Sequence, residues 1–225
     1  PRSLGPVAYG NFNFLTNFFT QIIGFLDMGT SLGFYTKLSQ RPKDAGLVTF
    51  YLKYFTGVIS FAVIAFVAGA QLTNTYSKIW PGQSIFYIYL AAFWGIFIWI
   101  CEVFNKMVDA YGITVYAEKM RMSQKFLATG LLLALFLSNR LSIASLFYYN
   151  YFILFLLGVA LVHGMRKSGF PIEGARGLSF ANIKIYLKEF YSYSHPLFVY
   201  SVVGLIVGIF DRWLLQVYGG SVQQG

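Results

Sequence analysis

The chain consists of long apolar runs separated by short polar connections. Six of the runs are compatible with the roughly 20 residues that a helix needs to cross the hydrocarbon core of a bilayer. The connections between them are rich in Gly, Pro and charged residues, as in "SQRPKDAG" and "TNTYSKIWPGQS". The pattern therefore predicts six membrane-spanning helices, at Asn11–Tyr35, Tyr51–Leu72, Ile85–Phe104, Met120–Asn139, Ile143–Met165 and Leu197–Tyr218.

The composition agrees with a membrane protein. Hydrophobic residues make up 57% of the 225 positions and charged residues only 11%, whereas an average soluble domain has about 25% charged residues. The net charge of +9 does not indicate a nucleic-acid-binding protein, because the Lys and Arg residues lie between apolar runs and not on a solvated domain. We predict an all-α, polytopic membrane helix bundle that contacts membrane lipids and no nucleic acid.

Positive charge is distributed unevenly among the connections. Most of the 17 Lys and Arg residues lie near the connections that follow the first, third and fifth runs. Because positively charged loops are retained in the cytoplasm, these connections are predicted to be cytoplasmic. The basic and aromatic segment Ile183–Ser194, which precedes the last run, is predicted to be an amphipathic helix at the inner membrane surface.

Polar and small residues recur along the first run with helical spacing. At 100° per residue they fall within an arc of about 80°. Such a stripe lines a water-filled cavity or forms hydrogen bonds across a dry helix–helix interface. The length of the stripe and its carboxylate near mid-membrane favour the cavity. The stripe consists of Asn13, Asn17, Thr20, Gly24, Asp27 and Ser31.

The inner end of the third run carries three charged residues on one helix face. Glu102, Lys106 and Asp109 are spaced four and three residues apart, so they can form a ladder of ion pairs at the membrane interface. Glu102 lies deepest in the membrane. It becomes a gating or coupling candidate if it opens onto a cavity.

The last run contains an adjacent acid and base, Asp211 and Arg212. Both lie within about 100° of arc from the small residues Gly204 and Gly208, and small residues allow another helix to approach closely. Two interpretations are open. The two charges form an ion pair that stabilises one conformation or presents a cation to an anionic substrate, or they snorkel and fix the depth of the helix.

No constellation of catalytic residues is visible. The only histidines, His163 and His195, lie at the predicted cytoplasmic edges of two spans, and the single cysteine, Cys101, has no partner for a disulfide or a metal site. No metalloprotease, nucleotide-binding or hydrolase motif occurs. We therefore predict that the chain is not an enzyme and has no metal and no cofactor. Coupling to protons or sodium ions stays open.

Two segments carry a family resemblance. The segment "RSLGPVAYGNFNFLTNFFTQIIGFLDMGTSLGFYTKLSQ" resembles the part of bacterial polysaccharide flippases, the O-antigen (Wzx-type) transporters, in which an L-G-P-x-x-Y-G turn opens the second helix and a D-x-G precedes a basic loop. The segment "FDRWLLQVYGGSVQQG" resembles the seventh helix of that family, which ends in D-R-x-x-L and a glycine loop. The two motifs are about as far apart here as in the family.

The resemblance implies the fold of the multidrug/oligosaccharidyl-lipid/polysaccharide exporters, in which two six-helix lobes surround a cavity that opens alternately to each side. Residues 1–196 would supply helices two to six of the first lobe, and residues 197–225 the first helix of the second lobe. The chain would thus be a fragment from the N-terminal half of a longer transporter, without its first helix.

The resemblance also implies a function. The protein would move a polyprenyl-diphosphate-linked oligosaccharide across the bacterial inner membrane, in partnership with polysaccharide polymerase machinery. Asn13, Asn17, Thr20, Asp27, Ser31 and Arg212 would line the cavity, and Glu102 and Asp211 would be gating or coupling candidates. The alternatives are a cation-coupled multidrug exporter of the same superfamily and a membrane-embedded glycan polymerase or acyltransferase.

Overall fold

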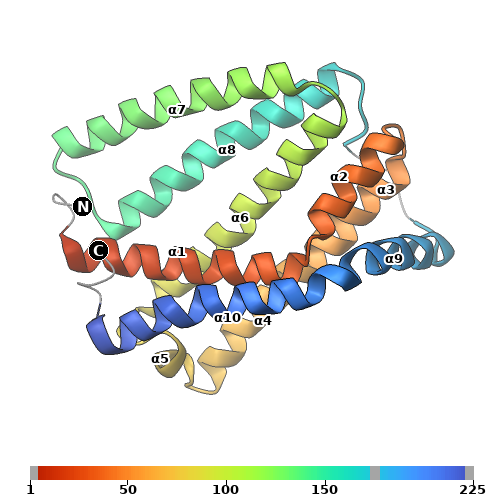
Figure 1. The fold of residues 1–225 in the computed structure, drawn as a ribbon. Helices are drawn as coiled ribbons and strands as arrows, with labels where there is room; N and C mark the ends of the chain where they lie inside the picture. The colour runs from red at the N-terminus through yellow and green to blue at the C-terminus, as the bar shows by residue number, and fades with distance from the viewer. Residues whose placement is uncertain (1–4, 173–177, 221–225) are drawn as a thin grey trace.

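In a computed structural model that describes residues 5–172 and 178–220, every element is a helix (Figure 1). The predicted all-α class is therefore confirmed. The elements are α1 Pro6–Asp27, α2 Thr30–Gln40, α3 Ala45–Thr49, η1 Phe50–Phe55, α4 Thr56–Leu72, α5 Tyr76–Ile79, α6 Ile85–Ala110, α7 Thr114–Leu137, α8 Ile143–Lys167, α9 Phe180–Ser194, η2 His195–Leu197, α10 Phe198–Leu214 and η3 Leu215–Gly219.

Five helical stretches of the described chain are long and apolar enough to cross a membrane. They overlap the second to sixth predicted spans, so the chain is a multi-pass helical membrane protein. Several are longer than predicted, because a helix continues beyond its apolar part into polar turns. The stretches are Ala45–Leu72, Ile85–Ala110, Thr114–Leu137, Ile143–Lys167 and Phe180–Gly219.

The prediction of one continuous helix over Asn11–Tyr35 is wrong. Helix α1 ends at Asp27 and α2 begins at Thr30, because the backbone turns into the left-handed region at Met28 (φ 45°) and Gly29 (φ 73°). Glycine adopts this conformation without steric cost, whereas a side chain such as that of methionine disfavours it. The turn redirects the chain, so residues after Gly29 no longer continue the face that begins on α1.

Helix α1 lies at the centre of the fold, between α6 and α10. Helix α10 runs beside α1 in the opposite direction, and α6 crosses α1 on another side (Figure 1). Both contacts are close at a glycine. A Cβ atom on Gly95 of α6 would lie 2.8 Å from Cδ1 of Ile23, and a Cβ atom on Gly208 of α10 would lie 2.7 Å from Cδ of Gln21. The absence of side chains at Gly95 and Gly208 lets both helices approach α1.

Helices α6, α8 and α7 pack in succession, with α8 between its two neighbours (Figure 1). Tyrosine hydroxyls join α7 to α8: Tyr149 donates to the carbonyl of Ala128 at 2.9 Å, and Tyr116 donates to the carbonyl of Ala160 at 3.0 Å. The polar ends of these tyrosines are satisfied by backbone oxygens, as a membrane interior requires.

Tyr111 connects the end of α6 to the segment that follows α8. Its ring stacks on Phe170 with the centroids 4.2 Å apart, and its hydroxyl donates to the carbonyl of Pro171 at 2.9 Å. Burial raises the pKa of the Tyr111 phenol well above its ordinary value, so the hydroxyl remains a donor. This contact fixes α6 and α8 to each other at the end predicted to be cytoplasmic.

Helix α9 begins at Phe180, close to the predicted start of the amphipathic segment. It is held against the connection between α2 and α3 by polar contacts. Nη2 of Arg41 lies 2.7 Å from Oε2 of Glu189, and the hydroxyl of Tyr186 donates to Oδ1 of Asp44 at 3.0 Å. Helix α9 therefore links this connection to α10, which follows it in the chain.

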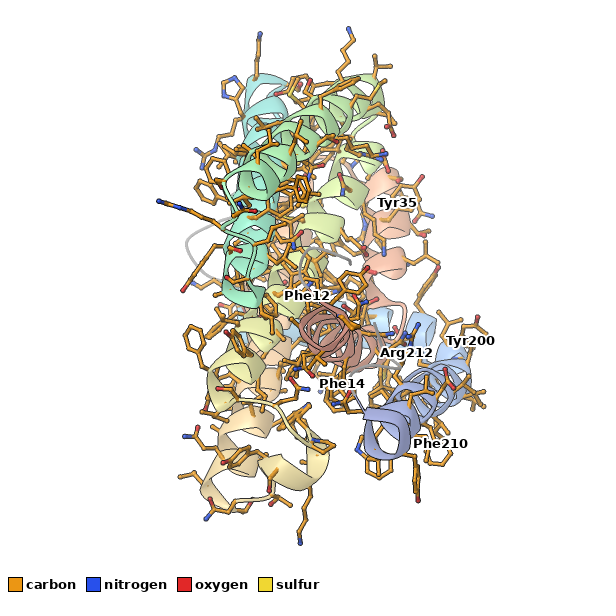
Figure 2. The ribbon with its side chains drawn as sticks, turned by 90° about the vertical axis from the view of Figure 1, so that its left-hand side faces the viewer. Phe12, Phe14, Tyr35, Tyr200, Phe210 and Arg212 are labelled. Atoms are coloured by element: carbon orange, nitrogen blue, oxygen red, sulfur yellow. The ribbon has the colours of Figure 1, made fainter. Side chains whose placement is uncertain are left out.

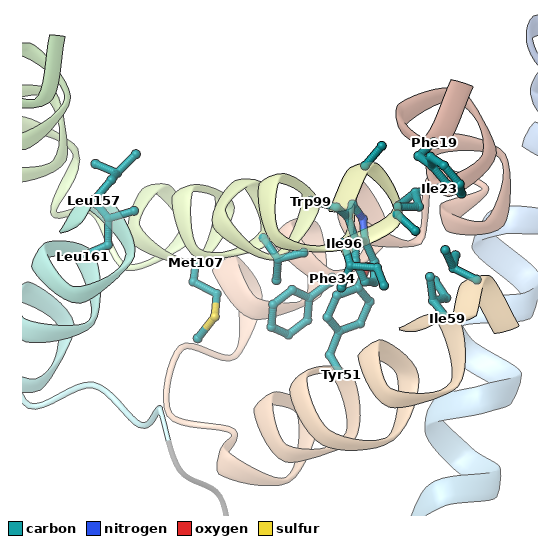
Figure 3. Close-up of a cluster of buried hydrophobic side chains, with 14 of the residues drawn as sticks. Phe19, Ile23, Phe34, Tyr51, Ile59, Ile96, Trp99, Met107, Leu157 and Leu161 are labelled. Carbon is teal, nitrogen blue, oxygen red and sulfur yellow. The ribbon is translucent and has the colours of Figure 1, made fainter. Parts of the chain in front are cut away.

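An aromatic core joins α2, η1 and α6 (Figure 3). The rings of Phe34 and Tyr51 are nearly parallel, with their centroids 4.2 Å apart, and Trp99 lies close to them. The π-helical turn η1, in which hydrogen bonds span five residues, includes Tyr51 near its start. Such turns commonly occur at functional sites. Here the turn brings the Tyr51 hydroxyl to Asp27.

Candidate functional site

A polar cavity of about 430 Å³ lies between α1, α6 and α10. This volume is within the range of small-molecule sites, about 300–1,000 Å³. The cavity combines amides, hydroxyls, an indole and a guanidinium, and its described lining contains no carboxylate. It is lined by Asn13, Thr16, Asn17, Thr20, Trp94 and Arg212.

The two asparagines present unused hydrogen-bonding groups to the cavity. Asn13 and Asn17 are partly buried, and among the described residues neither side-chain amide has a hydrogen-bond partner. Each amide offers one acceptor and two donors. Polar groups inside a membrane protein normally find partners. These two amides are therefore available to water or to a polar ligand.

The two threonines are arranged differently. The hydroxyl of Thr16 donates to the carbonyl of Phe12 at 2.8 Å, and that of Thr20 donates to the carbonyl of Thr16 at 2.8 Å. This bonding to the preceding turn is common for threonine in helices. Their protons are used within α1, so Thr16 and Thr20 offer the cavity acceptor lone pairs only.

Trp94 supplies the contribution of α6 to the cavity. Its ring packs edge-on against Tyr151 of α8, with the ring centroids 6.0 Å apart and the planes at 89°. The Tyr151 hydroxyl in turn donates to the carbonyl of Leu90 at 2.5 Å. The indole is thus held by a fixed neighbour and presents an apolar aromatic surface beside the amides of α1.

Arg212 brings a positive charge to the cavity from α10. Figure 2 views α1 and α10 nearly end-on and shows Arg212 on the side of α10 that faces α1, whereas Phe210 points away from it. The antiparallel pairing of α1 and α10 places Arg212, near the end of α10, beside the first half of α1. The structure thus brings together Asn13, Asn17, Thr20 and Arg212, which are far apart in sequence.

Of the two interpretations of Asp211 and Arg212, an ion pair between these two side chains is not formed. No salt bridge joins Asp211 to Arg212 among the described residues, and Asp211 is exposed. Consecutive residues on a helix point about 100° apart, so Asp211 is directed away from the cavity that Arg212 lines. Gly204 also has open space beside it, and only Gly208 makes the predicted close contact.

Asp27 and Ser31, predicted to line the same cavity, lie in a separate buried cluster. Oδ1 of Asp27 accepts hydrogen bonds from the Thr30 hydroxyl at 3.0 Å, the Ser31 backbone N–H at 3.1 Å, the Tyr51 hydroxyl at 3.1 Å and the Trp99 indole N–H at 3.3 Å. Oδ2 accepts from the Ser31 hydroxyl at 2.8 Å. Asp27 is 8% exposed. Asp27, the last residue of α1, is enclosed by donors from α2, η1 and α6, and the break that follows it turns Ser31 into the same cluster.

The three charged residues of α6 also differ from the prediction. Lys106 donates from Nζ to the Ser31 hydroxyl on α2, and Oδ1 of Asp109 lies 3.8 Å from Nη2 of Arg121 on α7. Glu102 is exposed and is not among the residues that line the polar cavity. The predicted ladder along one helix is therefore absent, because the neighbouring helices offer Lys106 and Asp109 other partners.

Sequence reasoning missed two lining residues. Thr16 lies one turn from Asn13 and Thr20, at the edge of the predicted stripe, so a wider arc would have included it. Trp94 carried no signal, because one tryptophan among many aromatic residues of an apolar run does not reveal which neighbour it faces.

No group of three or more His, Cys, Asp or Glu side chains that could hold a metal ion occurs in the described part of the chain. The cavity accordingly offers hydrogen bonds, an aromatic surface and a positive charge. Comparisons with protein-family models, with curated proteins and with solved structures find no match for the chain.

Proposed function

We propose that the chain belongs to a flippase that moves a polyprenyl-diphosphate-linked oligosaccharide across the bacterial inner membrane by alternating access. The observation that carries this proposal is the lining of the polar cavity. It combines two unpartnered amides, an indole and an arginine in a membrane-spanning bundle. The resemblance of the two sequence segments to polysaccharide flippases supports the same substrate class.

The chemistry of the lining suits both parts of such a substrate. Asparagine amides donate to and accept from sugar hydroxyls, and the apolar face of a sugar ring can pack on the Trp94 indole. The planar guanidinium of Arg212 can bind two phosphate oxygens at once. A hydrated glycan crossing a bilayer needs such a polar surface, because its hydroxyls would otherwise lose their hydrogen bonds in lipid.

The proposed position of the cavity is the boundary between two lobes. In the resembled fold α10 is the first helix of the second lobe, and α1 and α6 belong to the first. Substrate sites of secondary transporters commonly lie at the interface between such halves. A cavity that has walls from both lobes changes shape when the lobes rock, which alternating access requires.

The charge of the cavity favours a glycan flippase over a cation-coupled drug exporter. A site for a cationic drug or a coupling ion needs carboxylates, and the described lining has none. The nearest candidate on α1, Asp27, already accepts five hydrogen bonds from protein groups. For a glycan polymerase or acyltransferase, His163 on α8 and His195 on η2 would be the candidate bases, and neither lines the cavity.

The test is complementation of surface-polysaccharide export by Arg212 variants in cells that depend on this transporter. We expect the full-length protein with Arg212→Ala to insert normally and to lose most export, by about tenfold or more, since a charge-assisted hydrogen bond contributes about 1.5–3 kcal/mol. Arg212→Lys should be impaired to a smaller degree, because it keeps the charge and loses the planar fork.

Arg140→Ala provides the matched control, because Arg140 is an exposed cation in the connection between α7 and α8 and does not line the cavity. It should export normally. Full export by both Arg212 variants would leave Arg212 as an anchor of helix depth and would remove the main support for the proposal.

A further inference from the structure

A second cavity, also of about 430 Å³, lies between α6 and α8 and does not share a lining residue with the first. Its chemistry is divided along its length. Aromatic and aliphatic side chains line most of it, and the two basic residues stand at the end where α8 terminates. The residues that matter here are Phe97, Phe104, Phe155, Val159, His163 and Arg166.

The apolar part of this groove faces the surroundings of the bundle. Phe155 is 57% exposed and Val159 is 51% exposed, on the side of α8 that no described helix covers. In a membrane-spanning helix such residues contact lipid chains. The apolar walls, Phe97 from α6 and Phe155 from α8, thus form a channel that is open to the hydrocarbon region.

Gly158 gives the groove its depth. A Cβ atom on Gly158 would meet only the sulfur of Cys101 within 4 Å, at 3.8 Å. A larger side chain at this position would extend into the space that the groove occupies. The missing side chain therefore leaves room for a ligand between the two helices.

The basic end is suited to a phosphate group. His163 and Arg166 are three residues apart, so they lie on one face of α8. Arg166 lies in the last turn of this helix, where the helix dipole favours cations. An arginine fork binds phosphate oxygens, and the imidazole of a histidine adds an N–H donor. Basic pockets between membrane helices on the cytoplasmic side are typical sites for anionic lipid headgroups.

We propose that this groove binds an anionic phospholipid, with an acyl chain between α6 and α8 and the phosphate at Arg166 and His163. The argument is charge complementarity: the cations stand at one end of an apolar channel, at the membrane interface, which matches the division of a phospholipid into headgroup and chain. The site is separate from the polar cavity, so this proposal does not depend on the proposed transport function.

The test is native mass spectrometry of the full-length protein released from nanodiscs that contain phosphatidylcholine with a minor fraction of phosphatidylglycerol. We expect the wild type to retain phosphatidylglycerol in preference to phosphatidylcholine. Arg166→Gln should reduce this retention by about fivefold. Gly158→Phe should abolish retention of either lipid at this site, because the phenyl ring fills the groove.

Each variant has a matched control. Gly130→Phe makes the same substitution at an exposed glycine of α7 with nothing near its Cβ, and Lys167→Gln removes the cation next to Arg166, outside the groove lining. Both controls should retain lipid like the wild type. Arg166→Gln changes an exposed side chain, so the variant should fold. It therefore tests the proposal even if Gly158→Phe does not fold.

Three results would overturn the proposal. One is equal retention by Gly158→Phe and Gly130→Phe. Another is equal retention of the two phospholipids that Arg166→Gln does not change. The third is a dimer in the wild type that Gly158→Phe dissociates without altering lipid retention, which would assign the groove to a second copy of the chain.

Discussion

The polar stripe of the first predicted span separates into two regions with opposite character. On α1, the amides of Asn13 and Asn17 face a cavity and have no hydrogen-bond partner among the described residues. At the last residue of this helix, the carboxylate of Asp27 is buried and accepts five hydrogen bonds. One stretch of sequence therefore provides both a site open to ligand and a closed structural cluster.

The difference shows that a polar residue in a membrane helix gains its role from its neighbours. Asp27 lies where α2, η1 and α6 converge, and each supplies a donor. Asn17 lies where α6 and α10 leave space beside α1, and that space contains the charge of Arg212. Satisfied polar groups stabilise a fold, whereas unsatisfied ones are available for binding. The following substitutions test this division.

The largest effect is expected for Asp27→Ala. The change leaves the Trp99 indole N–H and the Ser31 hydroxyl buried without their acceptor, whereas the Tyr51 hydroxyl keeps Thr30 as a partner. Each unsatisfied buried group costs about 1–3 kcal/mol. We expect a loss of about 3 kcal/mol or more in unfolding free energy, measured as a lower thermal unfolding temperature of the purified protein in detergent. Asp211→Ala removes an exposed carboxylate and should unfold like the wild type. Equal unfolding of the two variants would contradict the structural role of Asp27.

An intermediate effect, on transport and not on stability, is expected for Asn17→Leu. The substitution keeps the size of the side chain and removes an amide that no described group uses. Loss of hydrogen bonds to a ligand corresponds to about a fivefold to tenfold decrease in export, since one bond is worth about 0.5–1.5 kcal/mol. The unfolding temperature should not fall. A destabilised protein with normal export would mean that Asn17 has a structural role, like Asp27, and not a binding role.

The smallest effect is expected for Tyr51→Phe. The ring keeps its stacking on Phe34, and only the hydroxyl that bonds to Asp27 and Thr30 is lost. We predict a decrease of about 1 kcal/mol in unfolding free energy. Tyr54→Phe is the control, because its hydroxyl forms no hydrogen bond with the described residues. A loss as large as that of Asp27→Ala would mean that Tyr51, and not the carboxylate, organises the cluster.

The sequence allowed the long helices to be predicted but not the break in the first one. Hydropathy located α4, α6, α7, α8 and α10 because lipid requires about 20 apolar residues in each. The polar residues keep their helical spacing of three and four residues across the break at Met28 and Gly29. Ser31 therefore fitted the predicted stripe, although α1 ends before it.

The candidate site was only partly predictable for a related reason. The face of α1 that carries Asn13 and Asn17 follows from helical geometry. Whether that face borders a polar cavity depends on Trp94 and Arg212, which reach it only through the packing of α6 and α10. The same holds for Lys106 of α6. It contacts Ser31 of α2 and does not form the ion pairs that were predicted along α6.

The most direct test compares two single cysteines from the original stripe, Asn17→Cys and Ser31→Cys, in a background in which Cys101 is replaced by alanine. Each protein is exposed in the membrane to an impermeant thiol reagent, and the modified fraction is measured. The account predicts that the cysteine at position 17 reacts readily and that the one at position 31, which is 3% exposed in the wild type, does not. Equal modification of both positions would contradict the division of the stripe into an open cavity and a closed cluster.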